Sequence, residues 1–370
     1  MADDRLYWVG FNLIKGIGAV RLQGLLDHFG DLSLAWQSST SELEQAGLSP
    51  KIIQNMQQIR QQVDLPRLVS EIEKQGIQVL TWQDEKYPAR LKEINQPPPV
   101  LYLRGSYELE DAWAVAVVGT RHMTAYGRQV AEEIGSYLGN HGITVISGLA
   151  RGVDAVAHTA ALDAGGRSIA ILGCGVDKIY PPENRGLAER LCEAGGLLSD
   201  YAPGTPPDSS NFPPRNRIIS GLSLATVIIE AGMESGAMIT ASFAAEQGRE
   251  VFAVPGNIHA PQSAGTNHLI QEGAHPLLDP HELLSTLELT CVEEKIATRR
   301  NLPADPTESR LLSEMGLEPL HADELSTRLD LPIEMISATL TVMELKGMIR
   351  QVGGMSYVAV RESAGIYGVN

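Results

Sequence analysis

Six short apolar runs, each followed by glycine-rich turn residues and mostly by a helical pattern, constrain the fold of this 370-residue chain most strongly. A run that is apolar throughout, rather than alternating, is typical of a strand buried on both faces. The pattern predicts an α/β fold with a doubly wound, mostly parallel sheet. The runs are Ala114–Val118, Thr144–Ile146, Ser168–Leu172, Leu197–Leu198, Thr226–Ile229 and Val251–Val254.

The flanking regions predict further domains around a central domain of residues 65–289. Helical spacing of apolar residues predicts a small all-helical domain over residues 1–64. Within it, Gly16-Ile-Gly18 is either a helix-hairpin-helix turn that points N–H groups at a phosphate or a simple helix connection. Residues 290–306 contain Pro303 and Pro306 and predict a linker. Three helical patterns and a hairpin then predict a winged helix over residues 307–362.

The composition excludes several classes of protein. A formal charge of −16, with no long basic segment, opposes a broad basic face that coats duplex DNA. The three cysteines have no C-x-x-C spacing, so we expect neither a disulfide framework nor a zinc site. There is no apolar run of about 20 residues to span a membrane and no signal-peptide pattern, so we expect a cytoplasmic protein.

Cationic and small polar residues gather in the loops after the predicted strands. The carboxyl ends of parallel strands meet at one edge, where helix N-termini supply N–H donors and partial positive charge. In Asn211-Phe-Pro-Pro-Arg-Asn-Arg217, the prolines fix φ, so we expect a stiff loop that presents two arginines to phosphate; the alternative is a surface pair with only local ion pairs. The residues predicted at this edge are Gly119, Thr120, Arg121, Ser147, Gly148, Arg151, Lys178, Arg185, Arg215, Asn216, Arg217 and Asn257.

The candidates for catalysis are weaker. Asp154 and His158 have i, i+4 spacing but no further metal ligands nearby, which favours a helix N-cap contact and a packed histidine. Cys174, between two glycines, fits a tight turn better than a nucleophile. Glu230 and Glu234 fit hydrogen bonding to neighbouring loops. Because the dinucleotide fingerprint is also missing, we expect no catalytic residue, no cofactor and no metal.

Several motifs, taken together and in order, resemble the DNA-processing protein A (DprA/Smf) family. The resemblance extends from about Asp84 to Asp279 and implies an extended Rossmann-like domain. Some members of this family also have a sterile-alpha-motif-like N-terminal domain and a C-terminal winged helix. The motifs are Val117-Val-Gly-Thr-Arg121, Ser147-Gly-Leu-Ala-Arg-Gly-Val-Asp154, Gly173-Cys-Gly-Val-Asp-Lys178, Phe212-Pro-Pro-Arg-Asn-Arg217, Glu230-Ala-Gly-Met-Glu-Ser-Gly236 and Val251-Phe-Ala-Val-Pro-Gly256.

The resemblance also implies a function. Members bind single-stranded DNA, form homodimers and help load the RecA recombinase onto incoming strands during natural transformation. By position, Arg121 matches the family's DNA-binding arginine, Ser147 and Gly148 match the facing loop, and Arg215 to Arg217 match its Arg-Asn-Arg motif. We therefore expect binding dominated by phosphate contacts, limited base stacking on an arginine plane or on Tyr180, and little sequence preference.

Two other interpretations stay open. One is a Rossmann-like, nucleotide-binding phosphoribohydrolase, although Ala264-Gly-Thr266 lacks the double glycine of that class of enzyme. The other is a winged-helix regulator with a ligand-sensing α/β domain. The expected recognition helix, residues 333–346, has two acidic residues and one terminal lysine, so we expect it to contact protein rather than duplex DNA.

Overall fold

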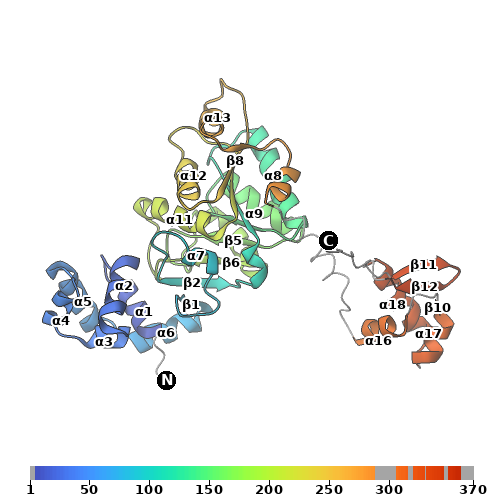
Figure 1. Cartoon of the computed structure of the whole chain (residues 1–370), viewed down its shortest axis with the longest axis horizontal. Helices are drawn as coiled ribbons and strands as arrows, with labels where there is room; N and C mark the ends of the chain where they lie inside the picture. Colours follow the sequence, from blue (N-terminus) through green and yellow to red (C-terminus); the bar gives the residue numbers. More distant parts are fainter. Residues whose placement is uncertain (1–4, 288–305, 316–319, 330, 346–348, 360–370) are drawn as a thin grey trace, which may run out of the picture. The chain divides into compact units, whose positions relative to one another are not determined.

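The computed structural model describes residues 5–287, 306–315, 320–329, 331–345 and 349–359. The chain forms two compact units, residues 1–289 and 290–370, and each is described by itself (Figure 1). Residues 290–305 of the predicted linker lie outside the described residues, and Pro306 begins the first described helix of the second unit. Within the described ranges, no helix has the length and apolar character needed to cross a membrane.

A nine-stranded sheet in the order β1-β2-β6-β5-β4-β3-β7-β8-β9 forms the centre of the first unit. The strands from β6 to β9 in this order are parallel, whereas β2 pairs antiparallel with both β1 and β6. The mostly parallel α/β sheet is confirmed. The strands are β1 (Ile77–Thr81), β2 (Val100–Gly105), β3 (Ala114–Val118), β4 (Thr144–Ser147), β5 (Ser168–Ile171), β6 (Gly195–Ser199), β7 (Ala225–Ile228), β8 (Glu250–Ala253) and β9 (His275–Pro276).

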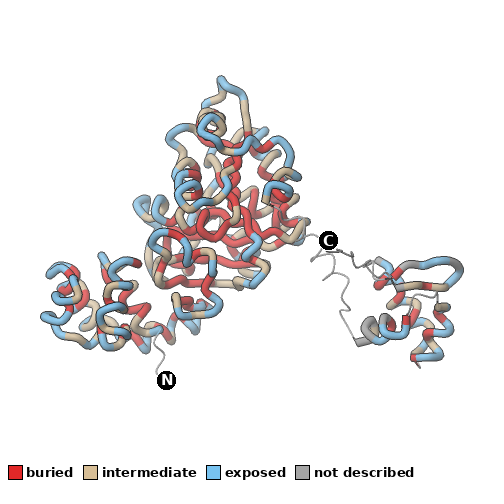
Figure 2. Tube along the Cα trace, viewed as in Figure 1, coloured by how far each residue is buried: buried red, intermediate tan, exposed pale blue. Residues whose placement is uncertain are grey.

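Helices cover the central strands on both faces. The helices α8, α9 and α10 pack on one face, and α11 and α12 pack on the other (Figures 1 and 2). The approach of α8 to α9 is close because Gly135 and Gly139 lie against Ala157 and Ala161, where a Cβ would collide with main-chain oxygens. The helices are α7 (Ala89–Lys92), α8 (Ala125–Asn140), α9 (Val153–Asp163), α10 (Arg185–Glu193), α11 (Phe212–Leu222), α12 (Gly236–Glu246), α13 (Ala264–Gln271) and α14 (His281–Thr286).

The N-terminal region is all helical, as predicted, and packs beside the antiparallel edge of the sheet (Figure 1). Buried Trp8 belongs to the same core as Tyr102 of β2, and the Tyr102 hydroxyl donates a hydrogen bond to Asn12 Oδ1 over 3.0 Å. The division at residue 64 stays a prediction, because these helices and the sheet form one compact unit. The helices are α1 (Arg5–Asn12), α2 (Ala19–Phe29), α3 (Leu32–Gln37), α4 (Thr40–Gln45), α5 (Pro50–Gln62) and α6 (Leu65–Lys74).

The turn Gly16–Gly18 connects α1 to α2. Gly16 has a φ of 102°, which favours glycine, and its carbonyl accepts a hydrogen bond from Arg21 Nη1 over 2.6 Å. The described contacts fit a connection between helices, and a phosphate-binding role for this turn stays a prediction.

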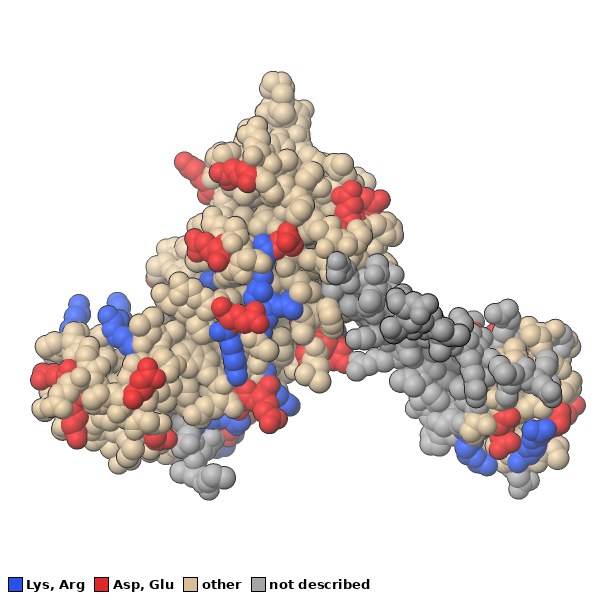
Figure 3. Space-filling model, in the orientation of Figure 1, with Lys and Arg blue, Asp and Glu red and all other residues tan. Residues whose placement is uncertain are grey.

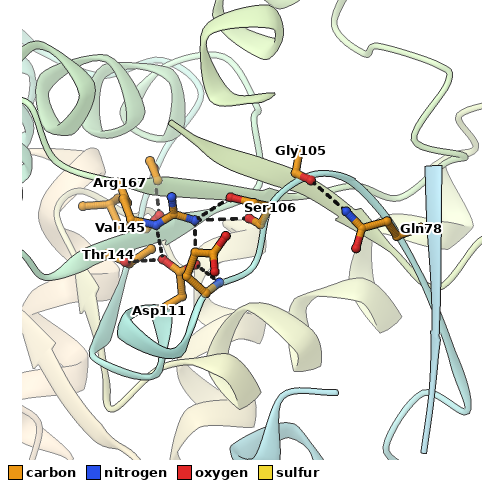
Figure 4. Close-up of polar contacts among 9 residues, drawn as sticks. Gln78, Gly105, Ser106, Asp111, Thr144, Val145 and Arg167 are labelled. Atoms are coloured by element: carbon orange, nitrogen blue, oxygen red, sulfur yellow. Dashed lines mark hydrogen bonds and ion pairs between the residues drawn. The ribbon is translucent and has the colours of Figure 1, made fainter. Parts of the chain in front are cut away.

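An ion pair between buried Asp111 and partly exposed Arg167 joins the amino ends of the central strands (Figure 4). Asp111, which is fully buried, accepts hydrogen bonds from Arg167 Nε and Nη2, both over 2.8 Å. Its Oδ1 also accepts from Thr144 Oγ1 over 2.7 Å. Since these residues lie before or at the start of β3, β4 and β5, the pair holds the sheet edge that is opposite the predicted site.

The second unit is a winged helix, as predicted. Its three-stranded sheet has the order β10-β12-β11. Leu325, Ile336, Leu340 and Tyr357 belong to a separate buried core. The elements are α16 (Pro306–Glu314), β10 (Leu320–His321), α17 (Ala322–Leu329), α18 (Ile333–Leu345), β11 (Ile349–Gly353) and β12 (Ser356–Ala359).

Candidate functional site

A cavity of about 670 Å³ lies at the carboxyl ends of the central strands. It is lined by the loop after β3 and by the first turns of α11 and α12. This volume falls within the range of sites that hold a nucleotide-sized ligand. The lining residues that can contribute polar or ring contacts are Thr120, Arg121, Tyr180, Phe212, Arg215, Asn216, Glu234, Ser235 and Thr240.

The loop that carries Arg121 is held by a buried glutamate. Thr120 N donates to Glu230 O over 2.7 Å, and Thr124 N and Oγ1 donate to the Glu230 carboxylate over 2.8 and 2.6 Å. Glu230 follows β7 and is only 3% exposed. The expectation that Glu230 bonds neighbouring loops is confirmed. Arg121 itself is exposed, so this arrangement fixes its main chain and leaves its guanidinium accessible.

The prediction that the Arg-Asn-Arg segment is a stiff loop was wrong. The helix α11 begins at Phe212 and takes both prolines into its first turn. Pro213 and Pro214 are compatible with this position because N–H groups in the first turn have no acceptor within the helix. The side chains of Arg215, Asn216 and Arg217 therefore radiate from a helix in different directions.

Arg215 forms a buried part of the cavity lining, with 4% exposure. Its Nη1 donates to Gly148 O over 3.0 Å and to Ile171 O, at the ends of β4 and β5. Burial lowers the pKa of Arg215 to about 10, so it stays charged at neutral pH. Asp154 nearby accepts from Gly148 N and Ala150 N over 3.1 and 3.4 Å, so it bonds the preceding loop and not the first turn of its own helix as predicted.

The Phe212 ring lies near both Arg121 and Arg215, and the Tyr180 ring lies next to Phe212. The Phe212 ring centroid is 5.9 Å from Arg121 Cζ and 5.8 Å from Arg215 Cζ, distances at which a cation is attracted to a ring face. The Tyr180 ring lies 5.8 Å from Phe212, with 33° between the planes. Tyr180 was predicted as a stacking residue and Phe212 was not, although its position directly before Pro-Pro-Arg was an available signal.

Three of the six cations predicted at this edge line a cavity. Arg121, Arg151 and Arg215 together line a small adjoining cavity. Arg151 is exposed and forms an ion pair with Glu183, which is also exposed. Figure 3 shows Lys and Arg side chains gathered near the middle of one face of the first unit, beside acidic side chains.

Lys178, Arg185 and Arg217 line neither of these cavities, so their contact with DNA stays a prediction. Arg217 lies two residues after Arg215, or about 200° around the helix. Its Nη2 therefore reaches Asp200 Oδ2 over 2.9 Å. Lys178 and Arg185 are exposed on the longer loop after β5 and at the start of α10.

The remaining predicted residues also divide into those that line a cavity and those that do not. Those that line a cavity are Gly119, Thr120, Gly148 and Asn216. Ser147 is fully buried, and its Oγ donates to Val117 O over 2.7 Å. Asn257 is exposed, and its Oδ1 accepts from His259 N over 2.9 Å, so it stabilises its own turn.

Two of the candidate catalytic side chains, Cys174 and His158, are buried in settings that make them unreactive. Burial raises the pKa of the Cys174 thiol to about 11 and lowers the pKa of His158 to about 3. His158 Nδ1 lies 2.7 Å from Ser168 Oγ and packs in the core, as predicted. Among the described residues, no group of three or more His, Cys, Asp or Glu side chains could hold a metal ion. The arrangement is suited to binding an anion beside a flat ring.

Comparisons with known proteins agree with the motifs. The family model of DNA recombination-mediator protein A matches residues 78–288, and that of the DprA winged helix domain matches residues 295–355. Protein Smf of Synechocystis sp. is 34% identical over 392 residues, which cover 96% of this chain and 98% of that protein.

Two solved structures are similar to this one. DNA processing protein A (DprA) from Streptococcus pneumoniae has a TM-score of 0.67 and 33% identity, and the match covers 76% of this chain and 97% of that chain. The DNA processing protein A from Helicobacter pylori, described for its single-stranded DNA binding mode, has a TM-score of 0.52 and 31% identity, covering 57% of this chain and 95% of that chain. By its sequence, its fold and these relatives, the chain belongs to the DNA recombination-mediator protein A (DprA/Smf) family.

Proposed function

We propose that this protein binds single-stranded DNA in the strand-end cavity and hands the strand to a RecA-type recombinase. The observation that carries the proposal is the exposed Arg121 guanidinium beside Phe212, above the buried charge of Arg215. Arg121 pairs with a phosphate, and a neighbouring base stacks on Phe212 or Tyr180.

The charge of the chain favours a single strand over a duplex. At a formal charge of −16, a stiff duplex laid across the surface meets repulsion over most of its length. A flexible single strand can enter a cavity where cations are concentrated. The relative from Helicobacter pylori is described by its single-stranded DNA binding mode, which supports the same ligand here.

The second part of the proposal is the transfer of the bound strand to a recombinase. The name of the family, a recombination mediator, supports it. In the same proposal the protein acts as a homodimer during natural transformation, as the resemblance implies. The exposed residues of α18 include Glu334 and Glu344 and no Lys or Arg, so the winged helix contacts protein rather than duplex DNA.

Fluorescence anisotropy with labelled oligo-dT and a matched duplex tests the proposal. Arg121→Glu is compared with Arg67→Glu, an identical change at an exposed arginine on α6, outside the cavity. We expect salt-sensitive binding of the single strand by the wild type and by Arg67→Glu, and loss of most of that binding in Arg121→Glu. Equal binding by both variants would remove Arg121 from the site, and preference for the duplex would contradict the proposed ligand.

A further inference from the structure

Part of the cavity lining comes from the segment between β7 and α12 and from the first half of α12, and it contains no cation. The polar residues that it contributes are Glu234, Ser235 and Thr240. Glu234 is exposed and lines the cavity, and no described residue donates a hydrogen bond to its carboxylate or forms an ion pair with it. The cavity therefore has cations and rings on the loop after β3 and on α11, and a carboxylate without a described partner on the segment before α12.

A free carboxylate excludes phosphate from its side and accepts hydrogen bonds only. In a single strand the Watson–Crick edge of each base is available for such bonds. Guanine presents two adjacent N–H donors, N1–H and N2–H, which match the two carboxylate oxygens. Cytosine and adenine present an amino group beside a ring acceptor, and thymine presents one N–H between two carbonyls that repel a carboxylate.

We propose that Glu234 selects the base of the nucleotide held in this cavity, favouring guanine over thymine. The inference rests on the proposed single-strand binding and deepens it. It also departs from the expectation of little sequence preference. One base of the strand would be selected, whereas the other expected contacts are to phosphates.

The local structure holds Glu234 in place for this role. The next residue, Ser235, is the N-cap of α12, and its Oγ accepts from Ala237 N. Ser235 N donates to Gly232 O over 3.0 Å. Asn216 Nδ2 donates to Gly236 O over 3.2 Å, which ties α12 to the helix that carries Arg215. A carboxylate on a fixed main chain discriminates better than one on a free loop, because less is lost in ordering it.

The test measures the affinity of the full-length protein for oligo-dT and for the same strand with one central thymine replaced by guanine or by hypoxanthine. Since a bidentate base contact discriminates by about tenfold or more, we expect the guanine strand to bind the wild type about tenfold more tightly than oligo-dT. Hypoxanthine lacks the N2 amino group and should lose most of this gain. Glu234→Gln should bind the guanine and thymine strands within about twofold of each other, whereas the control Glu189→Gln, at an exposed site on α10, should keep the preference.

The outcomes separate this inference from the proposed function. Equal affinity of the wild type for the guanine and thymine strands, or an unchanged guanine preference in Glu234→Gln, would overturn the role of Glu234. If, in that case, Arg121→Glu still fails to bind all three strands, the protein binds single strands in the cavity but does not select a base. Absence of binding to any strand by the wild type would refute the proposed function and this inference together.

Discussion

Two arginines line the same cavity, but the structure gives them different roles, and substitution can separate them. Arg215 is 4% exposed and donates to Gly148 O and Ile171 O, whereas Arg121 is exposed on the loop after β3. Arg215→Ala removes two hydrogen bonds from a charged donor, each worth about 1.5–3 kcal/mol, and leaves two carbonyl groups without that donor. We therefore expect Arg215→Ala to lower the free energy of unfolding by about 3–5 kcal/mol.

Arg121→Ala should change the free energy of unfolding by less than about 0.5 kcal/mol, as is usual for an exposed side chain. Urea unfolding followed by tryptophan fluorescence measures both changes. All four tryptophans lie in the first compact unit, so the signal reports on the unit that contains the cavity. Wild-type stability in Arg215→Ala, combined with loss of single-strand binding, would refute the structural role and make Arg215 a direct contact.

Three further substitutions test other parts of the structure. Asp111→Asn removes the charge that pairs with Arg167 and should cost about 2 kcal/mol of unfolding free energy in urea titrations, since hydrogen bonds between charged groups are lost at a buried carboxylate. Burial lowers the pKa of His158 to about 3, so stability is full above about pH 6.5 and falls by about 1.4 kcal/mol per pH unit below it; His158→Gln should remove that slope, and an unchanged acid dependence would contradict the assignment. Glu230→Gln weakens the support of the loop that carries Arg121 and should lower single-strand affinity about threefold to tenfold by anisotropy, with the salt dependence of binding kept.

The central strands could be predicted from the sequence because strands buried on both faces are apolar throughout. The six runs correspond to β3 to β8, and the winged helix followed from its helical periods and its hairpin. The edge strands β1 and β9 were not predicted. β9 has two residues, too few for a pattern, and β1 is defined by its antiparallel pairing with β2, a contact that local sequence does not encode.

The chemistry of the site could be predicted only in part. The loop after β3 was identified correctly, because the end of a strand fixes where its loop emerges. The directions in which the Arg215 and Arg217 side chains point could not be predicted, because they depend on where α11 begins. A start at Phe212 turns one arginine into the cavity wall and the other toward Asp200. Phe212 was missed because a single phenylalanine carries no periodic signal, and its partners come from distant loops.

Cross-linking tests the location of the single strand most directly. An oligo-dT that contains iodouracil is bound to the full-length protein, cross-linked by ultraviolet light and mapped by mass spectrometry of peptides. We predict cross-links at Tyr180 and Phe212, the rings that line the cavity, and their loss in Arg121→Glu. Cross-links confined to residues 5–74 or 306–359 would contradict binding in the strand-end cavity.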